Sequence, residues 1–184
     1  MKFRFPAVAV LGAALAIAGE SEFNLTDLEN RPVHFSTAQS AATAVVFIST
    51  KCPVSNAYND RMNAIFKEFS AKGVQFLFVN ANDNEPLAEI REHAKSAQFQ
   101  FPVFKDANNV LADRLGAQST PEAFVFDRAG EVKYHGSIDD QKNEARVKVQ
   151  GLREALNAML LGASPNPAET KAFGCTIKRA RKTS

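Results

Sequence analysis

The chain has 184 residues and a formal net charge of +2, with 45% hydrophobic and 23% charged residues. This composition excludes wholesale disorder, and the length suits one domain with its own hydrophobic core. Two bases lie in the first four residues and five in the last fourteen, so the body between them is net negative. Because no basic face is expected on that body, nucleic acid is excluded as a main partner.

The first eighteen residues have the three parts of a signal peptide. Lys2 and Arg4 form a positive start, residues 7–18 are apolar, and Ala16-Ile17-Ala18 fits a small-x-small cleavage site. The apolar run is shorter than the roughly 20 residues that span a membrane. We therefore expect a signal peptide over residues 1–18 and a periplasmic or secreted protein without stable membrane insertion after cleavage. An uncleaved membrane anchor is the alternative.

The first half of the mature chain alternates strands with a helix. Residues 23–35 alternate apolar and polar side chains around a turn, which predicts a β-hairpin. A solidly apolar run at 44–48 and a second, mostly apolar run at 74–79 predict two buried strands. Between them, apolar side chains recur at helical spacing over residues 54–72, and Gly73 is typical of a helix end.

The second half adds more helices and another hairpin. In chain order, the predicted elements are a helix at 86–97, a short extended segment at 101–104, a short helix at 109–115, an antiparallel hairpin at 123–127 and 131–135, and a last helix at 149–161. This order predicts an α/β fold with a mixed central sheet, helices on both faces and an N-terminal β-hairpin. The domain would span residues 19–162 and be followed by a basic tail at 163–184.

Cys52 is the first candidate for chemistry. It follows the strand at 44–48 and precedes a helix that begins near Pro53. Backbone N–H groups in the first turn of a helix are unpaired and carry partial positive charge, so a thiolate there is stabilised and its pKa falls. Pro53 fits because a helix start does not need its N–H group. The alternative is a buried, inert thiol.

Thr120 and Pro121 are the second candidate, because they stand just before an apolar strand. A proline at such a point often follows a cis peptide bond, which would expose neighbouring backbone groups to an extended substrate docking as an added strand. A trans proline that merely begins the strand is the alternative. Thr50 and Ser55 are expected first as loop or capping residues, and both are candidates to donate hydrogen bonds to a Cys52 thiolate.

These motifs together resemble the thioredoxin superfamily. The run Thr50-Lys-Cys-Pro53 between a strand and a helix, followed by Thr120-Pro-Glu-Ala-Phe-Val-Phe-Asp127 and a glycine-containing hairpin, carries the resemblance. The hairpin pattern Phe-x-Leu-x-Asp at 23–27 is similar to the redoxin branch, which holds exported thiol-disulfide oxidoreductases and antioxidants of the alkyl hydroperoxide reductase type. The resemblance covers residues 22–162. It implies a thioredoxin-like three-layer fold, Cys52 as the reactive thiol, and substrate docking at Thr120 and Pro121.

Three departures from these family patterns narrow the activity. Ser55 stands where thioredoxin-like oxidoreductases carry a second cysteine, so a local dithiol cycle is impossible. Val45 and Ser49 replace the Pro and Thr of the peroxiredoxin pattern Pro-x-x-x-Thr-x-x-Cys. Asn56 replaces the second cysteine of copper-delivery relatives. The cysteines and histidines also lack metal-ligand spacing, so we predict neither a metal nor a cofactor.

Cys175, in the basic tail, is the only other cysteine. The chain resembles a subgroup of exported redoxin-domain proteins that combine Cys-Pro-Val-Ser-Asn with a C-terminal Gly-Cys-x-Ile-Lys-Arg. Phe173 and Ile177 are apolar anchors that would dock the tail on the body. Three interpretations stay open: a structural disulfide with Cys52, a redox-cycling resolving cysteine, and a free or intermolecular thiol. A long closed loop would add roughly 4 kcal/mol of stability in the chain-entropy model.

Three functional hypotheses follow. The first is an exported thiol-disulfide oxidoreductase acting on protein thiols or disulfides, with Cys52 as nucleophile and Cys175 as a distant resolving cysteine. The second is a thiol peroxidase acting on small peroxides, and the third is a redox-inert binding module stapled by a permanent disulfide. His135 is expected in a surface turn, or else near Cys52 as a proton shuttle, and Arg61 is expected to face solvent. The sequence makes no prediction of the oligomeric state.

Overall fold

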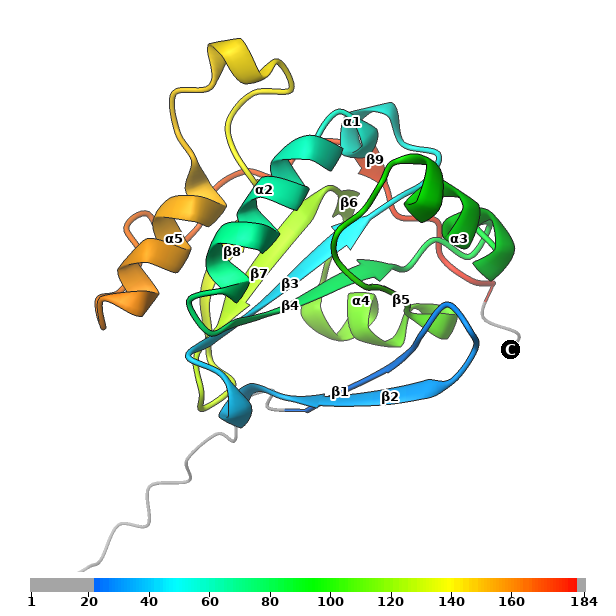
Figure 1. Ribbon diagram of the computed structural model, residues 1–184, viewed down its shortest axis with the longest axis horizontal. Coiled ribbons are helices and arrows are strands. Elements are labelled where there is room, and N and C mark those ends of the chain that lie inside the picture. The colour runs from blue at the N-terminus through cyan, green and yellow to red at the C-terminus, as the bar shows by residue number, and fades with distance from the viewer. Residues whose placement is uncertain (1–21, 182–184) are drawn as a thin grey trace, which may run out of the picture.

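A seven-stranded mixed sheet forms the centre of the computed structural model, which describes residues 22–181 (Figure 1). Its strands are β1 (Glu22–Thr26), β2 (Pro32–Ser36), β3 (Ala42–Ile48), β4 (Val74–Asn80), β5 (Val103–Lys105), β7 (Glu122–Phe126) and β8 (Val132–Gly136). They lie in the order β2-β1-β5-β4-β3-β7-β8. Strands β3, β4 and β5 are parallel, and β7 is antiparallel to β3. The signal peptide predicted at 1–18 lies outside the described residues.

Helices cover both faces of this sheet (Figure 1). They are α1 (Pro53–Asn56), α2 (Asn59–Ser70), α3 (Leu87–Ser96), α4 (Val110–Leu115) and α5 (Gly151–Leu160), with short 3-10 turns at Thr37–Gln39, Ala107–Asn109 and Glu144–Arg146. The helices α2, α3 and α5 place Met62, Ile90 and Leu156 in one hydrophobic cluster. Helix α4 places Leu111 in the other, which also holds Ile177 of the tail. The predicted three-layer α/β fold is confirmed.

The position of strand β3 in the sheet explains why its sequence is apolar except for Thr43. Ala44, Val46 and Ile48 point into one cluster, while Val45 and Phe47 point into the other. All seven of its residues are buried, as expected for a central strand with neighbours on both edges and helices on both faces. This strand carries the chain directly to the loop that holds Cys52.

The helix predicted over residues 54–72 is two helices. The backbone N–H groups of Ala57 and Tyr58 donate to Val54 and Ser55 at 3.1 and 3.0 Å, so the chain tightens into three-residue turns before α2 begins at Asn59. Tyr58, just before α2, is buried in the core. Apolar spacing alone does not reveal such a break, because both pieces contribute to the same cluster.

The tail after α5 packs against the body. It runs beside β8, where the His135 N–H donates to Ala168 O and the Thr170 N–H donates to His135 O, each at 3.0 Å. It then forms the two-residue strand β9 (Cys175–Thr176), which pairs with β6 (Ser119–Thr120) in a second small sheet (Figure 1). The tail is therefore an ordered part of the fold up to residue 181.

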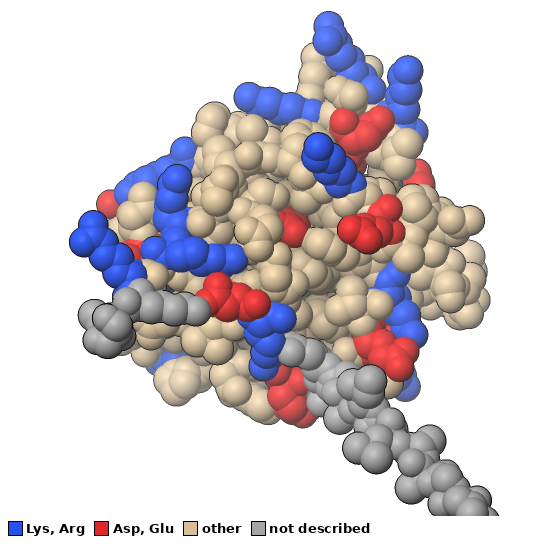
Figure 2. Space-filling view, turned by 180° about the vertical axis from the view of Figure 1, so that it is seen from behind, with Lys and Arg blue, Asp and Glu red and all other residues tan. Residues whose placement is uncertain are grey.

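Charged groups of both signs share the molecular surface. The face drawn in Figure 2 intersperses lysines and arginines with aspartates and glutamates, and it does not present one basic surface. Among residues 22–181, no helix is long and apolar enough to cross a membrane.

Candidate active site

Cys52 caps the N-terminus of α1, where the sequence placed it. Its backbone is extended, and its Sγ accepts a hydrogen bond from the Ser55 N–H at 3.3 Å. Pro53 takes the first helical position, where its missing N–H costs no hydrogen bond. The Cys52 side chain is only 2% exposed. A thiolate at this point would receive an N–H group and the positive end of a short helix.

Cys52 forms a disulfide bond with Cys175, which lies 123 residues later in the chain. Their Cα atoms are 5.8 Å apart, and the chain has no free cysteine. Of the three interpretations left open by the sequence, the free or intermolecular Cys175 does not match the structure. The structural and the redox-cycling disulfide both do.

Strand pairing places Cys175 at this position. Thr120 and Cys175 are directly paired residues of β6 and β9, and the Thr120 hydroxyl donates to Cys175 O at 3.4 Å. Cys52 Sγ lies 3.3 Å from Thr120 O, so a reduced thiol has an acceptor there. The Thr120–Pro121 peptide bond is cis, as predicted. The edge expected to dock a substrate strand is occupied by the chain's own tail.

Hydrogen bonds fix the tail beyond Cys175 as well. The Ile177 N–H donates to Gln118 O at 3.0 Å, and the Ile177 side chain is 2% exposed. The Lys178 N–H donates to Asn82 Oδ1 at 2.9 Å. Further along, the Ala180 N–H donates to Asn109 Oδ1 at 2.6 Å. Backbone and amide groups from three loops of the body therefore hold residues 177–180.

A buried carboxylate that sequence reasoning missed lies beneath the Cys52 loop. Glu85 is 1% exposed and accepts hydrogen bonds from the Ser49 hydroxyl at 2.6 Å, the Thr50 N–H at 2.8 Å and the Asn80 side chain at 2.5 Å. Burial works to raise the pKa of Glu85, but the hydrogen bonds from Ser49, Asn80 and Thr50 outweigh it and hold the pKa below its usual value. Glu85 is therefore an ionised carboxylate at neutral pH.

Ser49 links Glu85 to Cys52 through hydrogen bonds. Its hydroxyl donates to Glu85 and accepts from the Cys52 N–H at 3.1 Å and the Lys51 N–H at 3.2 Å. The sequence signal for Glu85 was its place after β4, because the carboxyl ends of the parallel strands β3 and β4 meet at one edge of the sheet. Chemically active residues of α/β folds collect at that edge.

Thr50 and Ser55 take different places around Cys52. Ser55 gives Cys52 its backbone N–H, while its hydroxyl accepts from the Ser49 N–H at 3.1 Å. Thr50 gives its backbone N–H to Glu85, and its buried hydroxyl has no hydrogen-bond partner among the described residues. A pocket of about 240 Å³ lies beside the disulfide, lined in part by Lys51, Glu85 and Thr176.

His135 lies in strand β8 and pairs with β7, so both the expected surface turn and the alternative position near Cys52 are wrong. Its Nε2 is 2.6 Å from Glu122 Oε1, and its ring stacks on Phe124 with the centroids 4.2 Å apart. Glu122 in turn accepts the Gln118 and Ser119 N–H groups, each at 2.7 Å. His135 therefore contacts a carboxylate that positions β6, and no hydrogen bond joins it to Cys52 among the described residues.

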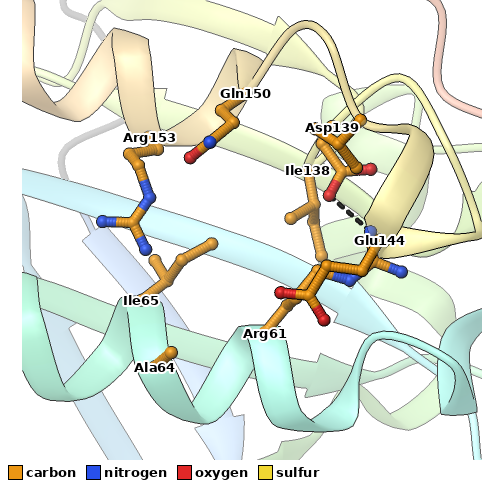
Figure 3. A pocket seen from close by; sticks show the side chains of 9 residues that line it. Arg61, Ala64, Ile65, Ile138, Asp139, Glu144, Gln150 and Arg153 are labelled. Carbon is orange, nitrogen blue, oxygen red and sulfur yellow. Dashed lines mark hydrogen bonds and ion pairs between the residues drawn. The ribbon is translucent and has the colours of Figure 1, made fainter.

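The prediction that Arg61 faces solvent is wrong. The Arg61 side chain is 8% exposed and forms an ion pair of 2.5 Å with Asp139 (Figure 3). Its guanidinium group also donates to Gln141 O and Lys142 O and lies 3.6 Å from the centre of the Tyr58 ring. Helical spacing puts Arg61 at the edge of the apolar stripe, and the segment after β8 folds over it. A pocket of about 320 Å³ separates this pair from Arg153 of α5 (Figure 3).

Comparisons with known proteins agree with this fold. The family model described as the AhpC/TSA family matches residues 20–135. The thiol-disulfide oxidoreductase ResA of Halalkalibacterium halodurans is 28% identical over 135 residues, which cover 71% of this chain and 76% of that protein. A ResA of Bacillus cereus is 23% identical over 110 residues, and the match spans 60% of this chain and 62% of the relative, less than two thirds of its length.

Solved structures show the same fold. A hypothetical protein of Sinorhizobium meliloti superposes with a TM-score of 0.79 at 27% identity, covering 91% of this chain and 96% of that one. An exposed lipoprotein thioredoxin of Streptococcus pneumoniae superposes with a TM-score of 0.57 at 18% identity, covering 66% and 93% of the two chains. The second match shows the thioredoxin-like fold alone.

Proposed function

The chain belongs to the AhpC/TSA family, and we propose that it is a thiol-disulfide oxidoreductase with Cys52 as nucleophile and Cys175 as resolving cysteine. The observation that carries the proposal is the Cys52–Cys175 disulfide between a helix N-terminus and a strand paired beside a cis proline. The ResA relatives, named as thiol-disulfide oxidoreductases, support the same activity.

The reaction follows from the two sulfurs. In the reduced protein, the Cys52 thiolate attacks one sulfur of a partner disulfide, and that bond breaks with its electron pair leaving on the partner's other sulfur. The product is a mixed disulfide between Cys52 and the partner. Cys175, as a thiolate, then attacks Cys52 Sγ. The partner sulfur that was bound to Cys52 leaves as the partner's second thiolate. The partner gains two electrons, the chain keeps the Cys52–Cys175 bridge, and the reverse sequence oxidises a dithiol.

The surroundings of Cys52 fit it for the thiolate role. The Ser55 N–H and the N-terminus of α1 stabilise negative charge on Sγ, which makes Cys52 both a populated nucleophile and a good leaving group. The Glu85–Ser49 hydrogen bonds fix the backbone of the loop that presents it. Electrons are stored in the sulfur pair itself, so the exchange needs no added cofactor.

Cys175 fits the resolving role because the fold returns it to Cys52. Ser55 stands three residues after Cys52, so a second thiol has to come from elsewhere in the chain. The pairing of β9 with β6 supplies it at a Cα separation of 5.8 Å.

Export completes the proposal. Residues 1–18 form a cleaved signal peptide, residues 19–162 the redoxin domain and residues 163–184 the tail that carries Cys175. The chain then works in the periplasm or after secretion, where disulfides persist, on protein thiols and disulfides. The three-part pattern of the first eighteen residues and the bridged cysteines support this location.

Turnover assays test the activity. We expect the chain to catalyse reduction of insulin disulfides by dithiothreitol, Cys52→Ser to abolish it, and Cys175→Ser to reduce it strongly. Unchanged turnover in Cys52→Ser would contradict the proposal. Hydrogen peroxide consumption that depends on Cys52, without insulin reduction, would instead identify a peroxidase. No activity, combined with a reduction potential below about −300 mV, would identify a structural disulfide.

A further inference from the structure

The tail shows how an extended peptide fits beside Cys52. Residues 175 and 176 pair with β6 as an antiparallel strand, and the Ile177 N–H continues the pairing to Gln118 O. An added strand on an exposed edge is a common way for a protein to bind a peptide, in which backbone bonds supply affinity and side-chain sites supply selectivity. The tail is such a peptide, covalently attached.

The position before the cysteine has room only for glycine. A Cβ built on Gly174 would overlap Thr120 O and lie 2.8 Å from Thr120 C and 3.3 Å from Pro121 N. These are backbone atoms held by β6 and by the adjoining β7, so they cannot turn aside as a flexible side chain would. Gly174 also has φ of +154°, which other residues rarely adopt. Any other residue there must lift the strand from Thr120.

The second position after the cysteine has a closed apolar site. Ile177 is buried in the cluster that contains Leu111, Ala112 and Ala117. By contrast, the residues at the first and third positions, Thr176 and Lys178, are exposed. The edge of β6 and the apolar site of Ile177 together form a groove. This groove contacts a peptide at alternate positions, as expected for an extended strand with one face buried.

We propose that this groove binds protein substrates and selects segments of the form Gly-Cys-x-Ile, with glycine before the reactive cysteine and a branched apolar residue two positions after it. This inference rests on the proposed function, because it identifies the substrate class of the same centre. Substrate and tail occupy the groove in turn. The substrate's cysteine joins Cys52 while the tail is undocked, and the returning tail brings Cys175 to Cys52 and releases the substrate thiol.

Peptide kinetics on the full-length double variant Gly174→Ala/Cys175→Ser test the selection. The alanine lifts the tail from Thr120, and Cys52 keeps its thiol. The probe is the peptide Phe-Gly-Cys-Thr-Ile-Lys-Arg-Ala with 2-nitro-5-thiobenzoate on its cysteine. Cys52 attacks the peptide sulfur, and the coloured nitrothiobenzoate leaves with the electron pair. We expect the peptide to react about tenfold faster than either alanine version. Alanine for glycine adds a Cβ that would overlap Thr120 O, and alanine for isoleucine leaves the apolar site unfilled.

Two outcomes distinguish failure of the proposed selectivity from failure of the proposed function. Equal rates for the three peptides, with Cys52 still reactive toward the small disulfide of nitrothiobenzoate, would overturn the selection and leave the proposed function intact. A Cys52 unreactive toward every disulfide would overturn both.

A second measurement does not depend on the double variant. With both cysteines present, Gly174→Ala should lower the equilibrium constant of the Cys52–Cys175 bridge against glutathione about tenfold. Gly162→Ala is the matched control, because Gly162 also has positive φ but an added Cβ there meets nothing within 4 Å. Equal constants for the two variants would also overturn the proposed fit at Gly174.

Discussion

Replacing Ile177 tests whether the docked tail is what holds Cys175 at Cys52. Ile177 is 2% exposed in the cluster on the α4 face of the sheet, so Ile177→Ala removes buried methyl and methylene groups. Such a change costs about 2–5 kcal/mol in a protein core. We take the lower end of this range, about 2 kcal/mol, as the loss in tail docking. Because 1.4 kcal/mol is about a factor of ten, the bridge should form with an equilibrium constant about thirtyfold lower.

The assay is equilibration of the protein in glutathione buffers, followed by acid quenching and separation of the oxidised and reduced chains. Leu161→Ala is the control, because Leu161 is a large apolar residue just after α5 that is 84% exposed. It should leave the equilibrium constant unchanged. A shift of less than threefold for Ile177→Ala, in a chain that retains its circular dichroism spectrum, would refute the reasoning that tail docking positions Cys175.

Three further predictions concern stability. The pKa of Glu85 lies below its usual 4.5, so its carboxylate stabilises the fold above that pH, and this contribution is lost as pH falls through the lowered pKa. Glu85→Gln should therefore cost about 1–3 kcal/mol at pH 7 and flatten the pH dependence of urea unfolding. Arg61→Ala leaves Asp139 buried without its partner and should cost about 3–5 kcal/mol in the same assay, whereas Lys72→Ala, at an exposed pair, should cost less than about 1 kcal/mol. Cys175→Ser opens a loop of 123 residues and should lower the free energy of unfolding by about 4–5 kcal/mol, and adding reductant to the natural chain should do the same.

The elements that the sequence predicted well depend on local patterns. The apolar run of β3, the capping position of Cys52 before Pro53, and the proline before β7 are each visible within a few residues. Periods of two and 3.6 residues report burial on a sheet or a helix, and the fold follows from their order. For this reason the sheet, its covering helices and one half of the thiol centre could be placed from sequence.

The features that the sequence missed depend on partners far along the chain. Arg61 is buried because Asp139, 78 residues later, accepts a hydrogen bond from its guanidinium group. Glu85 matters because the Ser49 loop, 36 residues earlier, folds onto it. The position of Cys175 could not be predicted because the strand that contains it has only two residues. The docking of the tail also depends on Asn82, Asn109 and Gln118, which are far from it in the chain. Local sequence patterns carry no information on which distant residues will pair.

Trapping of the reaction intermediate tests the central claim most directly. Reduced Cys175→Ser is mixed with a disulfide-containing protein, and the products are digested and analysed by mass spectrometry without reduction. Our account predicts a mixed disulfide that joins the substrate to Cys52, because the thiol that would release it is missing. The reciprocal variant Cys52→Ser should yield no such adduct. Adducts that form only through Cys175, or none with either variant, would contradict the assignment of Cys52 as nucleophile and Cys175 as its resolving partner.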